Sequence, residues 1–206
     1  MKNYLTEKEI KNLNKFAEKY NIEDLKIKDK EQIISIEISN YKIEHIPAEI
    51  FKLMNLKELY ISCVNLMELS GDIKNLSNLK MLEIKCDNLK RLPKEIWDLI
   101  NLEELDIICR NLESLPNEIE KLTNLKMLEI YSNNLKQLPK EIYNLINLKG
   151  FHIQSDSLEN FPDGIEKLVN LESIDISNRN KTLNFKDLPM EGIEKLNNLK
   201  ELHIHI

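Results

Sequence analysis

The chain repeats a phrase of 23 residues over most of its length, and this period restricts the possible folds more than any other feature. A leucine or isoleucine opens each unit, and successive openings lie 23 residues apart except at the last step, which is 28. A fixed period of about 20–29 residues built on leucine is typical of a solenoid, in which each unit stacks on the next. The units open at Ile33, Leu56, Leu79, Leu102, Leu125, Leu148, Leu171 and Leu199.

Within a unit, counted from its opening residue as position 1, the apolar pattern predicts one strand and one short helix. Positions 4 and 6 are apolar in each unit and position 6 is always isoleucine, which is the periodicity of a strand. Proline then follows position 14 in all units but the one with Ser70, and proline ends a strand because it has no amide hydrogen. Isoleucine at position 18 and leucine at position 21 lie on one face of a short helix or 3-10 turn.

The string LPxEIxxLxNLxxLxI resembles the leucine-rich repeat family, in the 23-residue form found in bacteria and in Ras-group-like proteins. The resemblance implies an α/β fold: a right-handed solenoid with a parallel sheet on its concave side and short helices or 3-10 turns on its convex side. It also implies a protein ligand on the concave side. One departure is that the asparagine typical of position 9 occurs only at Asn133, while asparagines stand in rows at positions 10 and 23. We assign these rows a structural role, because backbone groups in turns need partners.

Residues 1–32 are predicted to cap the first unit. Thr6 and Glu9 have the spacing of a capping box and are followed by an amphipathic helical pattern. Leu25 and the turn residues 29–30 then predict a hairpin that shields the first parallel strand.

Residues 33–206 are predicted to form about seven full units and a terminal strand. The five extra residues of the last step lie between Asn180 and Pro189; they represent either drift near the end of the array or a loop on the binding side. The chain stops inside the strand that contains His203 and His205, and an open strand edge invites pairing. We therefore expect a monomer or a weak dimer through the C-terminal edge.

Composition excludes several classes of function. The net charge of −6 argues against nucleic acid, whose binding needs clustered lysine and arginine. The sequence has no apolar run of about 18 residues for a membrane span and no secretory signal, so a cytoplasmic protein is expected, although export without such a signal stays open. Motifs for a nucleophile elbow, a phosphate loop or a zinc protease are absent, so neither an enzyme nor a cofactor is expected.

The outward positions 3, 5 and 7 of the strands predict a ligand-binding surface. Position 5 carries consecutive carboxylates at Glu83, Asp106 and Glu129, and like charges side by side cost a sheet stability. Either this is an ordinary solvated face or it is an acidic groove with apolar anchors for a basic protein or peptide. The candidate residues are Glu37, Tyr60, Met81, Glu83, Asp106, Ile108, Met127, Glu129, Tyr131, His152 and Asp175.

Two other clusters attract attention as metal sites. Cys63, Cys86 and Cys109 share position 8, where other units have serine or asparagine, so this slot favours small side chains rather than a redox or metal role. The histidines near the C-terminus, with Asp175, are interpreted as surface residues, and no metal is expected.

A second alternation runs along the convex side with a period of 46 residues. Position 19 is aromatic in every second unit, at Phe51, Trp97 and Tyr143, and position 22 is aliphatic in the same units. Either the rings pack in the groove between units, or they form a contact surface for a partner.

The pattern as a whole predicts a non-catalytic protein-binding module that uses its concave face. The alternatives are a secreted effector or antagonist of a host or competitor protein, and a structural unit that self-assembles through its C-terminal edge. A bacterial origin is indicated by the compact units and the frequent asparagine, lysine and isoleucine.

Overall fold

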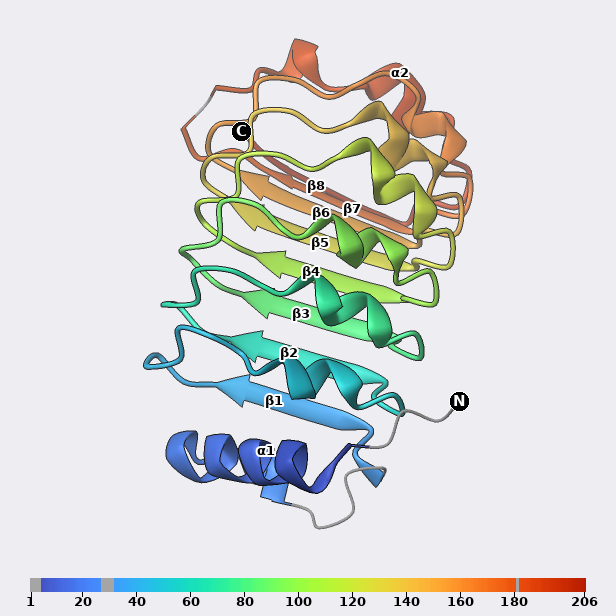
Figure 1. The fold of residues 1–206 in the computed structure, drawn as a ribbon. Helices are drawn as coiled ribbons and strands as arrows, with labels where there is room; N and C mark the ends of the chain where they lie inside the picture. Colours follow the sequence, from blue (N-terminus) through green and yellow to red (C-terminus); the bar gives the residue numbers. More distant parts are fainter. Residues whose placement is uncertain (1–4, 27–31, 181) are drawn as a thin grey trace.

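Eight parallel strands form one open sheet in chain order in the computed structural model, which describes residues 5–26, 32–180 and 182–206 (Figure 1). Each strand spans positions 3 to 7 of its unit or one residue more, so the strand predicted around positions 4 and 6 is confirmed. Pairing is in register, with Leu82 beside Leu105 and Ile84 beside Ile107. The strands are β1 (Ser35–Ser39), β2 (Glu58–Ser62), β3 (Met81–Lys85), β4 (Glu104–Ile108), β5 (Met127–Ser132), β6 (Gly150–Ser155), β7 (Ser173–Ser177) and β8 (Glu201–His205).

Short 3-10 helices follow the strands, as the spacing of positions 18 and 21 predicts. Proline stands directly before most of them and takes an extended conformation, for example φ −62° and ψ 137° at Pro93. Ser70 replaces proline with almost the same angles, φ −64° and ψ 139°, and its hydroxyl accepts a hydrogen bond from the Asp72 amide. The helices are η3 (Ala48–Lys52), η4 (Gly71–Asn75), η5 (Lys94–Asp98), η6 (Asn117–Lys121), η7 (Lys140–Asn144) and η8 (Ile165–Lys167).

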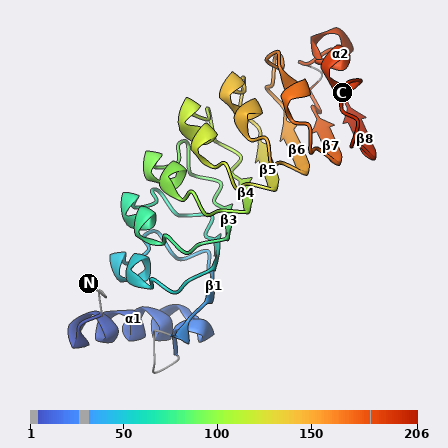
Figure 2. The same ribbon diagram turned by 90° about the vertical axis from the view of Figure 1, so that its right-hand side faces the viewer.

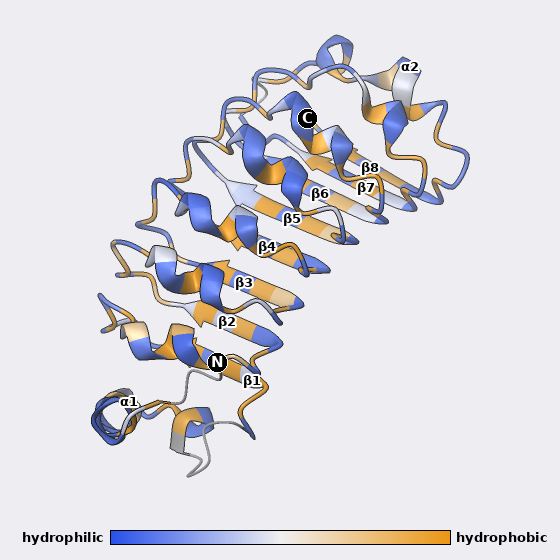
Figure 3. Ribbon diagram, turned by 45° about the vertical axis from the view of Figure 1, so that its right-hand side comes forward, coloured by the Kyte–Doolittle hydropathy of each residue, from blue (hydrophilic) through white to orange (hydrophobic). Residues whose placement is uncertain are grey.

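The stack curves with the sheet on its concave side and the 3-10 helices on its convex side, as Figure 2 shows. This is the solenoid that the repeat predicts. Colouring by hydropathy shows apolar and polar residues alternating along the strands (Figure 3). The inward residues at positions 4 and 6 of β2 to β5 are all at most 1% exposed. They form one continuous core between the sheet and the helices.

The large rings on the convex side belong to this core. Phe51, Trp97 and Tyr143 are each 0% exposed, so the alternative of a convex contact surface made of these three residues is wrong and the packing alternative is confirmed. They lie in η3, η5 and η7 and are fully enclosed, whereas alternate units place exposed side chains such as Lys74 and Glu120 at the same position. One large ring in every second unit therefore fills the groove and explains the period of 46.

The N-terminal segment covers the first unit with two helices. Helix α1 (Glu7–Tyr20) begins with the predicted capping box of Thr6 and Glu9, and it buries Leu13 and Ala17. The 3-10 helix η1 (Glu23–Lys26) follows, and Asp24 accepts a hydrogen bond from the Glu37 amide of β1 at 2.9 Å. Leu25 thus lies in a helix and not in a strand, while the turn of the predicted hairpin falls in 27–31, outside the described residues.

Asparagines at position 23 tie each unit to the one before it. Asn101 Nδ2 donates to the Ser77 carbonyl oxygen at 2.8 Å, and Asn124 Nδ2 donates to that of Ile100 at 2.9 Å. Position 10 makes a second, shorter ladder, in which Asn111 Nδ2 donates to the Asp87 carbonyl at 2.8 Å. The structural role predicted for these rows is confirmed. The position-23 bond recurs from Asn78, Asn147, Asn170 and Asn198.

Position 8 is an interior slot for small side chains. Cys63 Sγ donates to the Ile38 carbonyl at 3.3 Å, and Ser132 Oγ in the same slot donates to the Leu112 carbonyl at 2.7 Å. Burial raises the pKa of the Cys86 and Cys109 thiols to about 12. These thiols are therefore neutral and shielded, in agreement with a packing role.

The C-terminal unit differs from the others. Its five extra residues lead into two short helices, η9 (Phe185–Asp187) and α2 (Met190–Ile193), which lie on the side of the 3-10 helices rather than on the sheet (Figure 2). In β8 the inward Leu202 is 39% exposed, whereas its neighbour in register, Ile174, is 0% exposed. Within the described residues, no helix combines the length and apolar character needed to cross a membrane.

Candidate functional site

The concave face brings all the predicted binding residues onto one surface of the sheet. Because pairing is in register, position 5 forms an unbroken row from Glu37 in β1 to His203 in β8. Positions 3 and 7 form parallel rows on either side of it. We call these three rows together the concave face. With strands about 4.8 Å apart, Glu37 and Asp175 lie at opposite ends of it, and Glu83 to Tyr131 lie in its middle.

Negative charge is concentrated on the concave face. Its single lysine is Lys85, whose Nζ lies 3.1 Å from a Glu83 carboxylate oxygen. Eight carboxylates and one lysine give this face a net charge of −7, compared with −6 for the whole chain, so the other residues together are close to neutral. The carboxylates are Glu37, Glu58, Glu83, Glu104, Asp106, Glu129, Asp175 and Glu201.

Asp106 is the centre of this charge. It lies between Glu83 on β3 and Glu129 on β5, each in direct register with it. Partial burial raises the pKa of Asp106 to about 6, and the charges of Glu129 and Glu83 add to the effect. The arrangement makes the ionised face costly for the fold, since like charges on neighbouring strands repel.

Tyr60 borders the acidic centre and supplies a ring to it. It pairs in register with Glu83. Burial is the main cause of the raised pKa of its phenol, with further contributions from Glu58, Glu83 and Glu104. The hydroxyl therefore stays protonated at neutral pH, next to carboxylates.

Methionines at position 3 give the face its apolar patches. Met81 and Met127 flank Glu104 in register and are half-buried. Met127 leans over β6, because a Cβ on Gly150 would lie only 2.4 Å from the Met127 Cε. Sequence reasoning missed this role of Gly150, although the only glycine in that row was a signal for it.

Position 7 adds an apolar pair next to the charged centre. Ile108 on β4 and Tyr131 on β5 are side by side in register, and both are half-buried. With the methionines of position 3 they border the carboxylates on both sides. Acidic groups with apolar side chains on either side suit a basic partner with hydrophobic anchors.

The histidines at the C-terminal end of the concave face have polar neighbours and are not arranged as a metal site. His152 Nε2 lies 3.1 Å from Ser173 Oγ, a partner that sequence reasoning did not identify. His152 pairs in register with Asp175, and Asp175 with His203. No group of three or more histidine, cysteine, aspartate or glutamate side chains in the described part of the chain is arranged to hold a metal ion.

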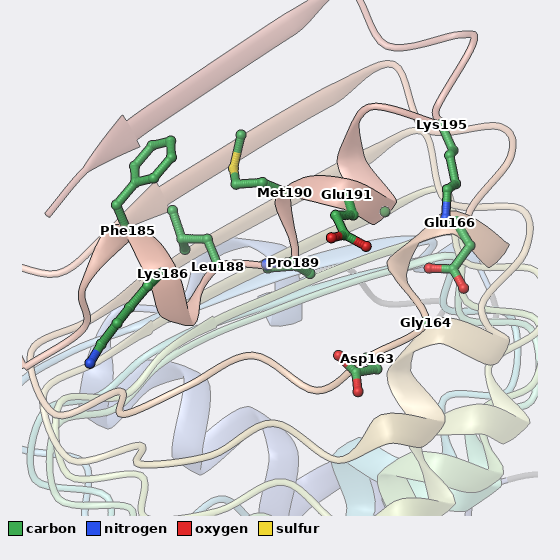
Figure 4. A pocket seen from close by; sticks show the side chains of 11 residues that line it. Asp163, Gly164, Glu166, Phe185, Lys186, Leu188, Pro189, Met190, Glu191 and Lys195 are labelled. Carbon is green, nitrogen blue, oxygen red and sulfur yellow. The ribbon is translucent and has the colours of Figure 1, made fainter.

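A separate pocket lies at the C-terminal unit, on the helical side. It has a volume of about 500 Å³ and is formed between η8 and the helices η9 and α2 (Figure 4). Asp163, Glu166 and Glu191 carry its negative charges, Lys186 and Lys195 its positive ones, and Phe185, exposed by 60%, contributes a ring. The five-residue insertion thus builds a hollow away from the concave face.

Comparison with known proteins agrees with this architecture. A family model described as leucine-rich repeat region matches residues 108–206. No protein of curated function matches the sequence.

Solved structures with the same fold come from bacteria and a plant. A leucine-rich repeat protein of Leptospira interrogans is 26% identical with a TM-score of 0.64, and the match covers 85% of this chain and 55% of that one. This chain thus spans little more than half of that protein. Internalin C2 of Listeria monocytogenes is 19% identical with a TM-score of 0.64, over 86% of this chain and 75% of that one.

The plant structure is the leucine-rich repeat ectodomain of the Arabidopsis thaliana membrane receptor kinase GASSHO1/SCHENGEN3, in complex with CASPARIAN STRIP INTEGRITY FACTOR 2. It is 21% identical with a TM-score of 0.59, over 84% of this chain and 24% of that one.

Proposed function

This chain is a leucine-rich repeat protein, and we propose on that premise that it is a non-catalytic module that binds a basic protein or peptide on its concave face. Proteins of this family generally act as interaction modules, and one structural neighbour was solved in complex with a partner. The proposed site residues are the eleven concave residues predicted from the sequence, centred on Glu83, Asp106 and Glu129.

The observation that carries the proposal is the carboxylate triplet in register on β3, β4 and β5. Its repulsion and the raised pKa of Asp106 are unfavourable for the isolated fold. Residues that violate a folding rule without local compensation are expected mainly at functional sites. Lys85 compensates part of this charge through Glu83, which leaves Asp106 and Glu129 to a partner.

Apolar residues around the triplet supply the second half of the argument. Tyr60, Ile108 and Tyr131 are half-buried and surround the carboxylates, and aromatic anchors carry much of the free energy of protein interfaces. An enclosed site that would desolvate a reacting group is not part of an open sheet, so binding suits this face better than catalysis.

Charge reversal on the concave face tests the proposal. The variant Glu83→Lys/Asp106→Lys/Glu129→Lys should no longer capture, from a lysate of the source cells, the proteins that the wild type captures and that mass spectrometry identifies. The matched control Glu68→Lys/Glu113→Lys/Glu159→Lys makes the same change in net charge at exposed carboxylates outside the sheet and should retain capture. If both variants capture the same proteins as the wild type, the concave face is not the binding site.

The cytoplasmic location is part of the proposal, and it is consistent with three free cysteines. The bacterial origin and the alternative of an effector or antagonist stay predictions. Self-association through β8 also stays a prediction, and sedimentation velocity over a concentration series tests it. A sedimentation coefficient that is independent of concentration would contradict it.

A further inference from the structure

A row of exposed aliphatic side chains runs along one edge of the solenoid, where the convex side turns into the sheet. It consists of Met54, Ile100, Ile146 and Val169 at position 22, which are 38%, 54%, 52% and 57% exposed. We call these four residues the edge row. Met54, Ile100 and Ile146 belong to the units with the buried rings, and Val169 belongs to the next unit. Unlike the rings, all four face solvent.

The backbone holds the edge row rigidly. Ile100 is in a tight turn closed by the Leu102 amide, which donates to the Leu99 carbonyl at 2.9 Å, and the carbonyl of Ile100 accepts from Asn124 Nδ2 at 2.9 Å. The same two bonds fix Val169, through Leu171 to Leu168 at 2.9 Å and through Asn198 Nδ2 at 2.8 Å. A preorganised apolar row loses little entropy when a partner binds.

A row of lysines borders the edge row. It occupies position 2 of the next unit, three residues after position 22 along the chain. Its two glutamates are each shared by two lysines: Glu103 by Lys80 at 2.9 Å and Lys126 at 2.5 Å, and Glu172 by Lys149 at 3.2 Å and Lys200 at 2.5 Å. The border therefore keeps an excess of positive charge, although the chain as a whole has a net charge of −6. The exposed lysines of the border are Lys57, Lys80, Lys126, Lys149 and Lys200.

The spacing of the edge row suits a helix. Met54, Ile100 and Ile146 are separated by two units, which places them about 10 Å apart at about 4.8 Å per strand. Seven residues of an α-helix rise about 10.5 Å, so a helix lying along the edge brings one apolar residue per heptad to each of them. Polar side chains at Ser77 and Thr123 in the same row fall between these contacts.

We propose that the edge row and its lysine border bind an acidic amphipathic helix of a partner protein. Leucine-type side chains of that helix pack on Ile100 and Ile146, and its carboxylates pair with Lys126 and Lys149. This surface differs in position and in charge from the concave face, so the inference does not depend on the proposed function.

Synthetic peptides test the proposal directly. The probe is a fluorescent acidic helix of about 22 residues with leucine at heptad spacing and glutamate at its other exposed positions, measured by fluorescence anisotropy against the full chain. Comparison peptides replace either the leucines by serine or the glutamates by lysine, and both should bind at least about tenfold more weakly, a loss of about 1.4 kcal/mol.

The variant Ile100→Thr/Ile146→Thr should fold normally, because Thr123 occupies the same position of its unit in the wild type. It should weaken binding of the acidic peptide at least about tenfold, as should Lys126→Glu/Lys149→Glu. The control Val64→Thr/Met67→Thr removes apolar side chains that are 44% and 64% exposed. These residues follow the C-terminal end of β2, whereas the edge row precedes the strands, so the control should leave binding unchanged.

Three outcomes overturn the proposal: no binding of the acidic peptide to the wild type, equal binding to the edge-row variant and the wild type, or equal binding of the basic peptide. Sedimentation with phosphatidylserine vesicles in the absence of peptide binding would assign the edge to a lipid surface instead and would also overturn it. Loss of capture by the concave triple variant with peptide binding intact separates this surface from the concave face.

Discussion

The concave sheet and the convex groove both contain columns whose residue type changes from unit to unit, but the two columns differ in what they contact. Position 5 on the concave side faces solvent and carries the carboxylates around Asp106. Position 19 on the convex side alternates between rings that are 0% exposed, such as Trp97, and exposed charges such as Glu120. Variation along a repeat therefore marks either a ligand surface or an alternating packing arrangement.

Charge and size distinguish the two cases. A column of consecutive like charges gains nothing from packing, so it indicates a surface. A column that alternates large with polar residues fits a groove that has room for one ring in every two units, as Phe51, Trp97 and Tyr143 show. Position 22 combines both patterns, because from Met54 to Ile146 it alternates like the rings, but its aliphatic side chains are exposed.

Truncation of a buried ring should have the largest effect on stability. Trp97→Ala is expected to lower the free energy of unfolding by about 3–5 kcal/mol, because it removes a fully buried ring from the groove. Chemical denaturation measures this change. Glu120→Ala at the same position is the control and should change stability by less than about 0.5 kcal/mol; similar values for the two variants would contradict the packing role.

The repeat predicted most of the fold because local pattern and tertiary contact coincide in a solenoid. Strand positions, 3-10 helices, capping box and asparagine ladders all follow from residue type at a fixed position. The exposure of position 19 could not be predicted, since the groove that receives Trp97 exists only after adjacent units stack. Leu25 was assigned to a hairpin, but a helix with Asp24 bound to the Glu37 amide covers β1 just as well.

The candidate site was predictable in its members but not in its energetics. Glu83, Asp106 and Glu129 hold the same position in successive units, so in-register pairing of the strands makes them neighbours. The partial burial that raises the pKa of Asp106, and the position of Met127 over Gly150, depend on side-chain conformations that residue spacing does not determine.

The last strand of the sheet offers a second test, because its inward side chains are much more exposed than those of the central strands. Leu105→Ala in β4 should cost about 2–5 kcal/mol, since Leu105 is 0% exposed. Leu202→Ala in β8 is the matched variant at the same position, and its 39% exposure leads us to expect less than about 1.5 kcal/mol. Equal losses in urea unfolding would mean that β8 is covered in solution.

Substitution at the carboxylates of position 5 should change stability in a pH-dependent way, whereas substitution of the packed apolar residues should not. The folded pKa of Asp106, about 6, lies above the usual value for aspartate, so ionisation destabilises the fold as pH rises through 6. Asp106→Asn is therefore expected to raise the free energy of unfolding by about 1 kcal/mol near pH 8, after allowance for partial exposure. The gain should shrink as pH falls below 6 and vanish below about pH 3, where aspartate is protonated in both states.

Denaturation midpoints of Asp106→Asn and wild type across this pH range make the comparison. Leu105→Ala in the same strand, which removes no ionisable side chain, is the control, and its difference from wild type should be independent of pH. A gain for Asp106→Asn that is independent of pH would show that packing, and not charge repulsion, limits stability at this position.

The interior slot at position 8 should tolerate the exchange of cysteine for serine. Cys86→Ser is expected to cost less than about 1.5 kcal/mol, because Ser132 in the same slot of another unit donates to a main-chain carbonyl at 2.7 Å. In the native protein all three thiols should react with a disulfide reagent only on unfolding, since they are buried and the pKa of the Cys86 and Cys109 thiols is raised to about 12. Fast labelling of folded protein at neutral pH would mean that the slot opens to solvent, and the distinction between packed and exposed columns would then have to be redrawn for β2 to β4.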